Sequence, residues 1–261
     1  MNTFKLLSAF LKVNIQMALA YRADTIVNIL LNIMWLGWEL LSLSIIFSNT
    51  ETIAGWGFGE IIALLGVFRL VHTLMIAIIW PNTEKFNQSI RDGSMDYTLL
   101  QPVNSMFLVT FSRITVWRAW DLVLAFVLIA IGINMSGDTV TVPQFLTFIL
   151  LTVSGAIVIY SLWIVLIALT FWFTKFDNNV TILQALMDAG RYPATVYPAW
   201  LRVIVTFVVP VAVATNVPLQ ALRGDLTFAR IIMFLAIGVF SFVIASQVWK
   251  RGLKQYSGAS S

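Results

Sequence analysis

Polar and charged side chains interrupt two of the long apolar stretches of this sequence. Steps of four and seven residues separate Asn28, Asn32 and Glu39, which places them on one face of a helix. Arg69 and His72 lie one helical turn apart in the next stretch. A charge at mid-bilayer costs about 2.5 to 3.5 kcal/mol on insertion scales, so each of these groups needs a partner or a hydrated path. At about 1.5 Å of rise per residue, Glu39 and Arg69 reach similar depths, which predicts an ion pair.

This ion pair has two interpretations. Glu39 and Arg69 can serve only to pin two helices together, or they can line a substrate path together with Asn28, Asn32 and His72. In an ion-coupled transporter, Glu39 or His72 would instead be the group that takes up a proton. The sequence leaves these alternatives open.

The residues that catalysis or metal binding would need are missing. A P-loop needs a Gly-Lys-Ser/Thr step, and no lysine of this chain follows a glycine. A single histidine and no cysteine cannot build the usual zinc sites, and neither a His-Glu-x-x-His nor a Gly-x-Ser-x-Gly stretch occurs. The sequence therefore predicts a chain that is not an enzyme and binds no metal or cofactor of its own.

The elements that position these residues follow from composition. Of the 261 residues, 59% are apolar and 11% are charged, against roughly 25% charged in an ordinary soluble domain. A soluble fold of this size cannot bury so much apolar surface. We therefore predict an all-α, polytopic integral membrane protein that forms a single domain over residues 1–261. Six windows are long enough to cross a bilayer: Thr25 to Phe47, Ile61 to Trp80, Phe107 to Met135, Phe145 to Phe173, Leu201 to Val217 and Phe228 to Trp249.

Charges in the third window shorten its buried part. Arg113, Arg118 and Asp121 lie in its first half, so the part in hydrocarbon should begin near Trp120. Arg118 and Asp121 are three residues apart, which predicts a local ion pair on one helix face.

A proline interrupts the fifth window. Pro210 cannot donate a helical hydrogen bond to the carbonyl of Thr206, so it should bend the helix there. The bend is either static packing or a hinge for opening a path, and Pro210 is the candidate hinge.

Residues 1–23 precede the first span and differ from it in pattern. Phe4, Leu7 and Leu11 recur at helical spacing, while Lys5 and Lys12 occupy another face. This pattern predicts an amphipathic helix in the membrane interface, with a frayed basic tail as the alternative. The first span itself is too long for a cleaved signal peptide.

Lysine and arginine fall mainly on one side of the predicted spans. Only Arg223 and Arg230 lie in segments on the other side, and Arg69 lies inside a span. Because cytoplasmic loops carry the excess of cations, both termini are predicted to be cytoplasmic. The cations occur singly rather than in a patch with aromatics, which excludes nucleic acid as an expected partner.

Residues 81–106 form the most distinctive loop, a predicted cytoplasmic segment. Thr83 should cap a short helix, and Gly93 suits the left-handed residue that ends it. The run IRDGSMDYTLLQP follows, from Ile90 to Pro102, and Phe86 with Ile90 could fill a groove on a partner. An ordinary connecting loop is the alternative.

Two motifs make the sequence resemble the ABC-2 type transporter permeases, in particular their six-span branch. The first is the I-R-D-G-x-x-D-x-x-L-L-x-P run from Ile90 to Pro102. The second is GRYPATVYPAWLR from Gly190 to Arg202, followed by TFVVPVA from Thr206 to Ala212. The motifs occur in the expected order between the expected spans, although nothing in the resemblance gives a role to Gly190 to Pro193.

The resemblance implies the permease subunit of an ATP-driven exporter in the bacterial cytoplasmic membrane. It implies two partners, a separate ABC ATPase that binds the ATP and a second, homologous but non-identical permease. It also implies a coupling helix that docks on the ATPase, which carries over to Ile90, Arg91, Asp92, Gly93 and Asp96. Tyr97 departs from the more polar residue expected after Asp96. A secondary transporter and a non-transporting assembly subunit remain alternatives, and the sequence does not identify the substrate.

Overall fold

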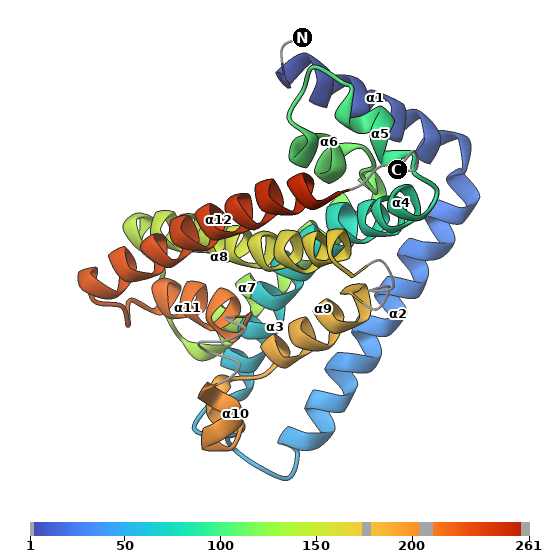
Figure 1. Ribbon diagram of the computed structural model, residues 1–261. Coiled ribbons are helices and arrows are strands. Elements are labelled where there is room, and N and C mark those ends of the chain that lie inside the picture. The colour runs from blue at the N-terminus through green and yellow to red at the C-terminus, as the bar shows by residue number, and fades with distance from the viewer. Residues whose placement is uncertain (1–2, 174–178, 204–210, 257–261) are drawn as a thin grey trace.

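The computed structural model describes residues 3–173, 179–203 and 211–256. In these ranges the regular structure is helical, apart from one isolated antiparallel bridge between Ile53 and Trp56. The all-α prediction is therefore confirmed (Figure 1). Five helices in the described part of the chain are long and apolar enough to cross a membrane: α2 (Arg22–Phe47), α3 with its continuation (Phe58–Arg91), α7 with the turn before it (Val116–Ser136), α8 with the turn after it (Val142–Phe171) and α12 (Phe228–Gln255).

The predicted fifth span is seen only at its two ends. Helix α10 (Ala199–Val203) and helix α11 (Val211–Arg223) flank residues 204–210, which lie outside the described residues. The candidate hinge Pro210 falls in that gap. A sixth span therefore stays a prediction.

The third span begins later than its apolar window. Helix α6 (Ser105–Phe111) is separate, and the turn η2 (Val116–Arg118) leads into α7 (Ala119–Ser136). The predicted start at Phe107 is therefore wrong, because α6 packs beside α4 and the following segment is not helical. The expectation that the membrane part begins near Trp120 agrees with the start of α7.

Helix α3 (Phe58–Leu74) does not stop at the predicted boundary, Trp80. It runs through the π-helical turn η1 (Met75–Ile79) into α4 (Trp80–Arg91). Pro81 has no N–H for the carbonyl of Ala77, and the N–H of Thr115 takes that place at 2.8 Å. Thr83 is therefore not a helix cap. Inside the continuous helix its hydroxyl donates to the carbonyl of Ile79 and accepts a 2.7 Å hydrogen bond from the Trp163 indole.

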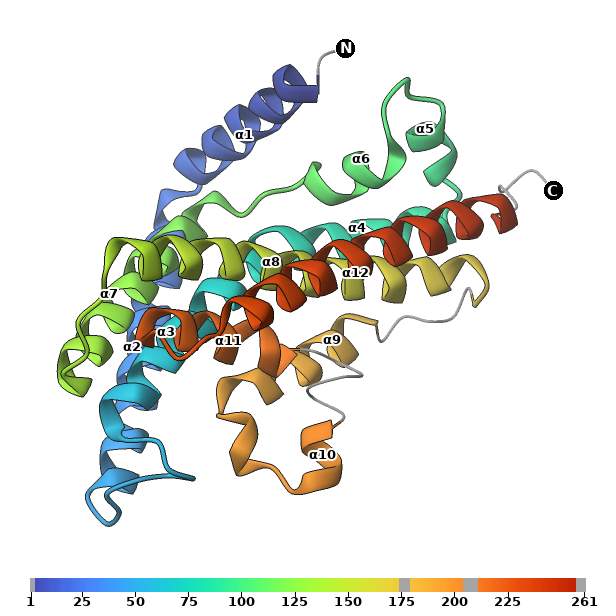
Figure 2. The same cartoon turned by 90° about the vertical axis from the view of Figure 1, so that its left-hand side faces the viewer.

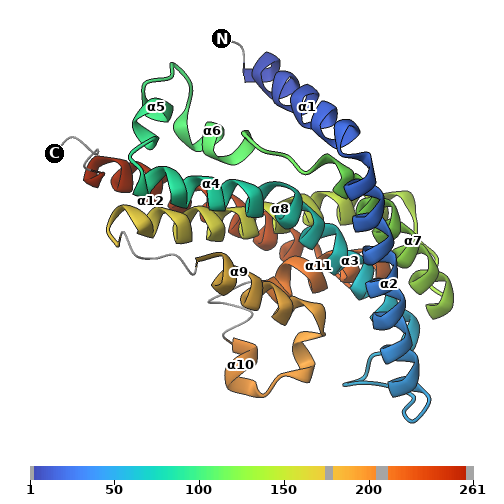
Figure 3. The same ribbon diagram turned by 90° about the vertical axis from the view of Figure 1, so that its right-hand side faces the viewer.

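Helix α3 occupies the middle of the packed helices. It contacts α7 along its length and also touches α2, α8 and α11. Helix α8 (Val142–Ala168) runs beside α12 (Figures 2 and 3). Helix α2 lies at one edge with most of its surface exposed (Figure 1). Among the described residues, buried side chains form three clusters, one of which holds the aromatic residues Phe86, Trp163, Phe171 and Trp249.

The predicted helix at the N-terminus is present as α1 (Thr3–Ala20). It leads into α2 at Tyr21 and contacts η2. It lies at the same end of the protein as α5 (Met95–Leu99) and α6 (Figures 1 and 2). Apolar side chains such as Leu11 and Ile15 are exposed, and its position in a membrane interface stays a prediction.

Candidate functional site

Arg69 is the centre of a polar network between the spans. Its guanidinium lies 3.0 Å from the Glu39 carboxylate on α2, and it donates a 3.1 Å hydrogen bond to the side-chain oxygen of Asn32. Only 13% of the Arg69 side chain and 20% of the Glu39 side chain are exposed. The predicted ion pair is therefore present, with the charge of each residue compensated by the other as burial requires.

The network continues from α2 to α7. The amide of Asn32 donates to the Asp121 carboxylate at 3.4 Å, and Arg118 forms a 3.0 Å ion pair with the same carboxylate oxygen. The Arg118 guanidinium also stacks over the Trp117 ring, 4.2 Å from its centroid. The predicted Arg118–Asp121 pair is thus confirmed, and through Asn32 it becomes part of a larger network that joins three spans.

A third arginine reaches the network from the second sequence motif. Arg191 ends the turn η4 (Ala189–Arg191), and its guanidinium lies 3.6 Å from Glu39 and 3.2 Å from Asp188. The carbonyl of Gly190 accepts a 2.9 Å hydrogen bond from Thr215 of α11. Sequence analysis missed this contact, although the motif that starts at Gly190 marked the segment. Glu39 is consequently shared between two arginines that come from different parts of the chain.

A cavity of about 340 Å³ opens beside these charges. Its walls combine the ion pairs with aromatic and hydroxyl groups: Trp35, Trp38, Glu39, Ser42, Leu43, Ile46, Ile61, Leu65, Arg69, Arg191 and Tyr192. The polar face of α2 is therefore turned toward a cavity over part of its length.

Two of the predicted path residues do not join this network. The Asn28 amide donates to the carbonyl of Asp24, one turn earlier in its own helix. His72 stacks on Phe68 with 5.2 Å between ring centroids and makes no hydrogen bond within the described residues. The structure thus brings together Asn32, Glu39 and Arg69 from the predicted set.

The first sequence motif forms a sharp elbow after α4. The helix ends at Arg91, and Gly93 adopts the left-handed backbone conformation with a φ of 75°, as predicted. The Asp92 carboxylate accepts a 2.9 Å hydrogen bond from the N–H of Ser94. Hydrogen bonds from Ser94 lower the pKa of Asp92, which keeps this exposed group ionised. Helix α5 (Met95–Leu99) follows at once.

The elbow has a buried side and an exposed side. Met95 is fully buried, and Ile90 packs against the aromatic cluster. On the exposed side, 74% of Tyr97 and 81% of Leu100 face outward. An apolar pair on an otherwise charged turn is typical of a surface that a partner covers.

Packing from behind holds the elbow in place. Phe86 packs on Phe171 and Trp249, with 5.5 Å between ring centroids in both pairs. The prediction that Phe86 fills a groove on a partner is therefore wrong, since only 2% of this residue is exposed. Just after α12, burial and the nearby carboxylates of Asp96 and Asp92 raise the pKa of Tyr256.

Asn82 fastens the segment after the elbow to α4. Its side-chain amide lies within 2.7 Å of the carbonyls of Ile78, Thr110 and Arg113. Its side-chain oxygen accepts from the Ser112 hydroxyl at 2.8 Å and from the Arg113 N–H at 2.9 Å. No sequence pattern identified this residue, which is almost completely buried.

Substitution of Asn82 by alanine should release this segment. Backbone groups of Thr110 and Arg113 would lose their partner, at a cost of about 1 to 3 kcal/mol. Faster hydrogen exchange over residues 105–115, measured by mass spectrometry, is the expected result. The exposed Asn49 makes only local hydrogen bonds, so Asn49→Ala should leave exchange unchanged. Unchanged exchange in Asn82→Ala would show that the network does not hold the segment.

Long apolar helices tied by an intramembrane ion-pair network, with a compact elbow at one end, define a polytopic α-helical membrane protein. Residues 33–260 match the model of the family described as ABC-2 family transporter protein. The chain belongs to the ABC-2 transporter family, which confirms the resemblance seen in its motifs. It is therefore an ABC permease in the general sense, and permeases of this family generally have an ATPase subunit as partner. A search of curated proteins found no match.

Proposed function

We propose that this chain is the permease subunit of an ATP-driven exporter, and that the elbow from Ile90 to Asp96 receives the motion of the ABC ATPase. The observation that carries the proposal is the unbroken helix Phe58–Arg91, which contains Arg69 and ends at the elbow. These two points are 22 residues apart, or about 33 Å along the helix. A displacement of the elbow would therefore reach the centre of the network through one rigid element.

The network would allow the helices to shift while the buried Glu39 carboxylate keeps an arginine partner. Glu39 lies 3.0 Å from Arg69 and 3.6 Å from Arg191. If α3 moves relative to α2, Glu39 can exchange its closer contact from Arg69 to Arg191 and stay paired. A switching transition needs two discrete arrangements of packed helices. Here the two would be Glu39 paired closely with Arg69 and Glu39 paired closely with Arg191. Asn32 and Glu39 would line the path at one such arrangement, beside the cavity already described.

Partners and topology complete the proposal. A second permease, homologous but non-identical, would cover the exposed edge formed by α2, and ATP would be bound by the ATPase subunits alone. Both termini would be cytoplasmic in a bacterial plasma membrane, with residues 1–23 in its interface. These statements are supported by family membership, the distribution of cations and the missing P-loop. A secondary transporter is less favoured, because Glu39 is already shared by two arginines.

Recovery of the ATPase with the tagged chain tests this proposal. From the native membrane in mild detergent, the parent chain should retain an ABC ATPase. Arg91→Glu combined with Asp92→Lys should reduce the retained ATPase more than tenfold, because like-charge contacts at an interface cost several kcal/mol.

Glu51→Lys is the matched control, since Glu51 lies in the exposed loop between α2 and α3, at the opposite end of α3 from the elbow. This variant should retain the ATPase. Absence of any ATPase from the parent complex would contradict the exporter and favour a secondary transporter or an assembly subunit. Equal loss in both variants would place the docking surface elsewhere.

A further inference from the structure

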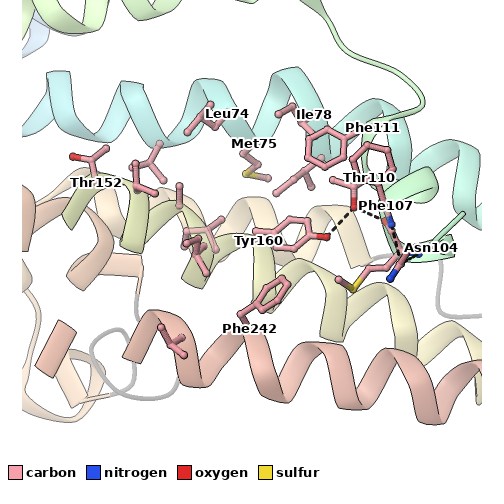
Figure 4. Close-up of a pocket in the computed structure, with 18 of the residues that line it drawn as sticks. Leu74, Met75, Ile78, Asn104, Phe107, Thr110, Phe111, Thr152, Tyr160 and Phe242 are labelled. Carbon is pink, nitrogen blue, oxygen red and sulfur yellow. Dashed lines mark hydrogen bonds between the residues drawn. The ribbon is translucent and has the colours of Figure 1, made fainter. Parts of the chain in front are cut away.

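A second, larger cavity lies beside the C-terminal end of α3 and the turn η1 (Figure 4). Its volume is about 980 Å³, at the upper end of the range for sites that hold a small molecule. Its walls come from α3 with η1, from α6 and the loop before it, from α8 and from α12. None of the described residues that line it carries a charge.

The polar groups in the cavity wall already have partners. The Thr110 hydroxyl donates to the carbonyl of Met106, so the 2.9 Å contact with Tyr160 is a hydrogen bond from the Tyr160 hydroxyl (Figure 4). The Thr152 hydroxyl donates to the carbonyl of Phe148. Water inside the cavity would find few free donors or acceptors over most of its length, and it needs two to four. The walls therefore suit a hydrocarbon occupant.

One end of the cavity differs from the rest. The side-chain oxygen of Asn104 caps α6 by accepting hydrogen bonds from the N–H groups of Met106 and Phe107. Its side-chain N–H groups have no hydrogen bond among the described residues. Asn104 is exposed, on the loop that follows the elbow. It gives the otherwise apolar cavity a donor at that end, where an ester or phosphate oxygen could be bound.

The residues at the opening of the cavity lie on the membrane-spanning helices. Leu74, Val153, Val239 and Phe242 lie on α3, α8 and α12, and all four are exposed, Val239 by 66%. In a bilayer these side chains face hydrocarbon, so the surrounding lipid can enter the cavity sideways without crossing a polar barrier.

We propose that this cavity binds an acyl chain of a membrane phospholipid, with the polar end of the lipid at Asn104. Two walls of the site are the π-helical turn η1 and the segment from Pro102 to Phe111. Turns of this kind often occur at functional sites. The turn η1 is part of the continuous helix, and the segment from Pro102 to Phe111 follows the elbow and α5, so the bound chain would contact the elements to which the proposed function assigns motion. The proposal stands on the cavity alone and does not depend on the ATPase.

Photolabelling of the purified chain in nanodiscs tests the site. The probe is a phosphatidylcholine with a diazirine on one acyl chain, mixed at increasing fractions into unlabelled phosphatidylcholine. Labelling of peptides over 71–79, 102–111 and 152–160 should saturate and exceed that of the outward face of α7 around Val123 at least fivefold. Labelling by lipid that merely surrounds the protein would rise in proportion to the probe.

Ala156 lines the cavity, so Ala156→Trp should fill it and lower the saturable labelling at least fivefold. Val123→Trp, on an exposed position of α7, is the matched control and should label like the parent. If Ala156→Trp does not give a monodisperse protein, Ala156→Leu fills less of the cavity and should lower the saturable labelling to a smaller extent. Unsaturable labelling, equal labelling in the filled variant, or cross-links to a second copy in place of lipid would each overturn the proposal.

Discussion

Replacement of Arg69 by alanine is expected to lower the free energy of unfolding by about 3 to 5 kcal/mol, the cost of removing one partner from a buried pair. Glu39 would keep only the 3.6 Å contact with Arg191, and Asn32 would lose its donor. The measurement is thermal unfolding of the purified chain in detergent. Arg230→Ala is the control, because Arg230 is exposed and has no ion pair among the described residues; it should change stability by less than about 0.5 kcal/mol.

A double-mutant cycle separates the pair from its surroundings. Arg69→Ala combined with Glu39→Gln should lower the free energy of unfolding by less than the sum of the two single changes. The reason is that Glu39→Gln removes the negative charge that Arg69→Ala leaves without its closer partner. Exchange of the two residues should recover only part of the stability, since the new arginine at position 39 would face Arg191. Additive single effects would show that the two side chains do not interact in the folded protein.

The partner of Arg69 could be read from the sequence because the pairing follows from helix geometry. Rise per residue gave Glu39 and Arg69 similar depths, and helical spacing put Asn32 on the same face. The same spacing also selected Asn28, which bonds to its own helix instead. Helical periodicity indicates the face of a residue, but it does not tell whether another helix covers that face at the given depth.

Arg191 could not be predicted because its position depends on how a distant turn folds back. The turn η4 lies near Glu39 because Thr215 on α11 donates a hydrogen bond to the Gly190 carbonyl and because η4 also contacts α3 and α9. Asn82 was missed for a similar reason, since its partners are carbonyls of a segment about 30 residues further on. Asn82 stands among polar residues in the stretch WPNTEKFNQSIR, so the sequence does not distinguish its buried amide from its exposed polar neighbours.

Hydropathy located most of the spans but misplaced some of their ends. Phe107 and its apolar neighbours line the larger cavity and pack beside α4, and hydropathy does not distinguish such a segment from a span. The second window was predicted to end at Trp80, yet the helix continues past Pro81 because Thr115 supplies the hydrogen bond that proline cannot. Helix ends that depend on hydrogen bonds from other segments of the chain cannot be predicted from local sequence.

Substitution of Gly132 by alanine should disrupt the contact on which the network rests. A Cβ atom at Gly132 would meet the backbone nitrogen of Ala63 and the carbonyl of Gly59 on α3. Backbone atoms cannot rotate away as a side chain can, so α3 and α7 would have to separate. Small residues that let helices approach this closely are typical of membrane interfaces. We expect the free energy of unfolding to fall by about 1 to 3 kcal/mol, the usual cost of overpacking, as measured by thermal unfolding.

Gly37→Ala provides the matched control, because a Cβ at this helical glycine has nothing within 4 Å. Relative to glycine, alanine favours a helix by roughly 0.5 to 1 kcal/mol, so this variant should be as stable as the parent or slightly more stable. The same Gly→Ala change should therefore lower stability at position 132 and leave it equal or higher at position 37. This difference would show that the loss at Gly132 comes from the close contact between helices and not from alanine itself. A Gly132→Ala protein that unfolds with the parent would mean that α3 and α7 do not approach this closely. Asp121 on α7 would then lack the fixed position from which it reaches Asn32.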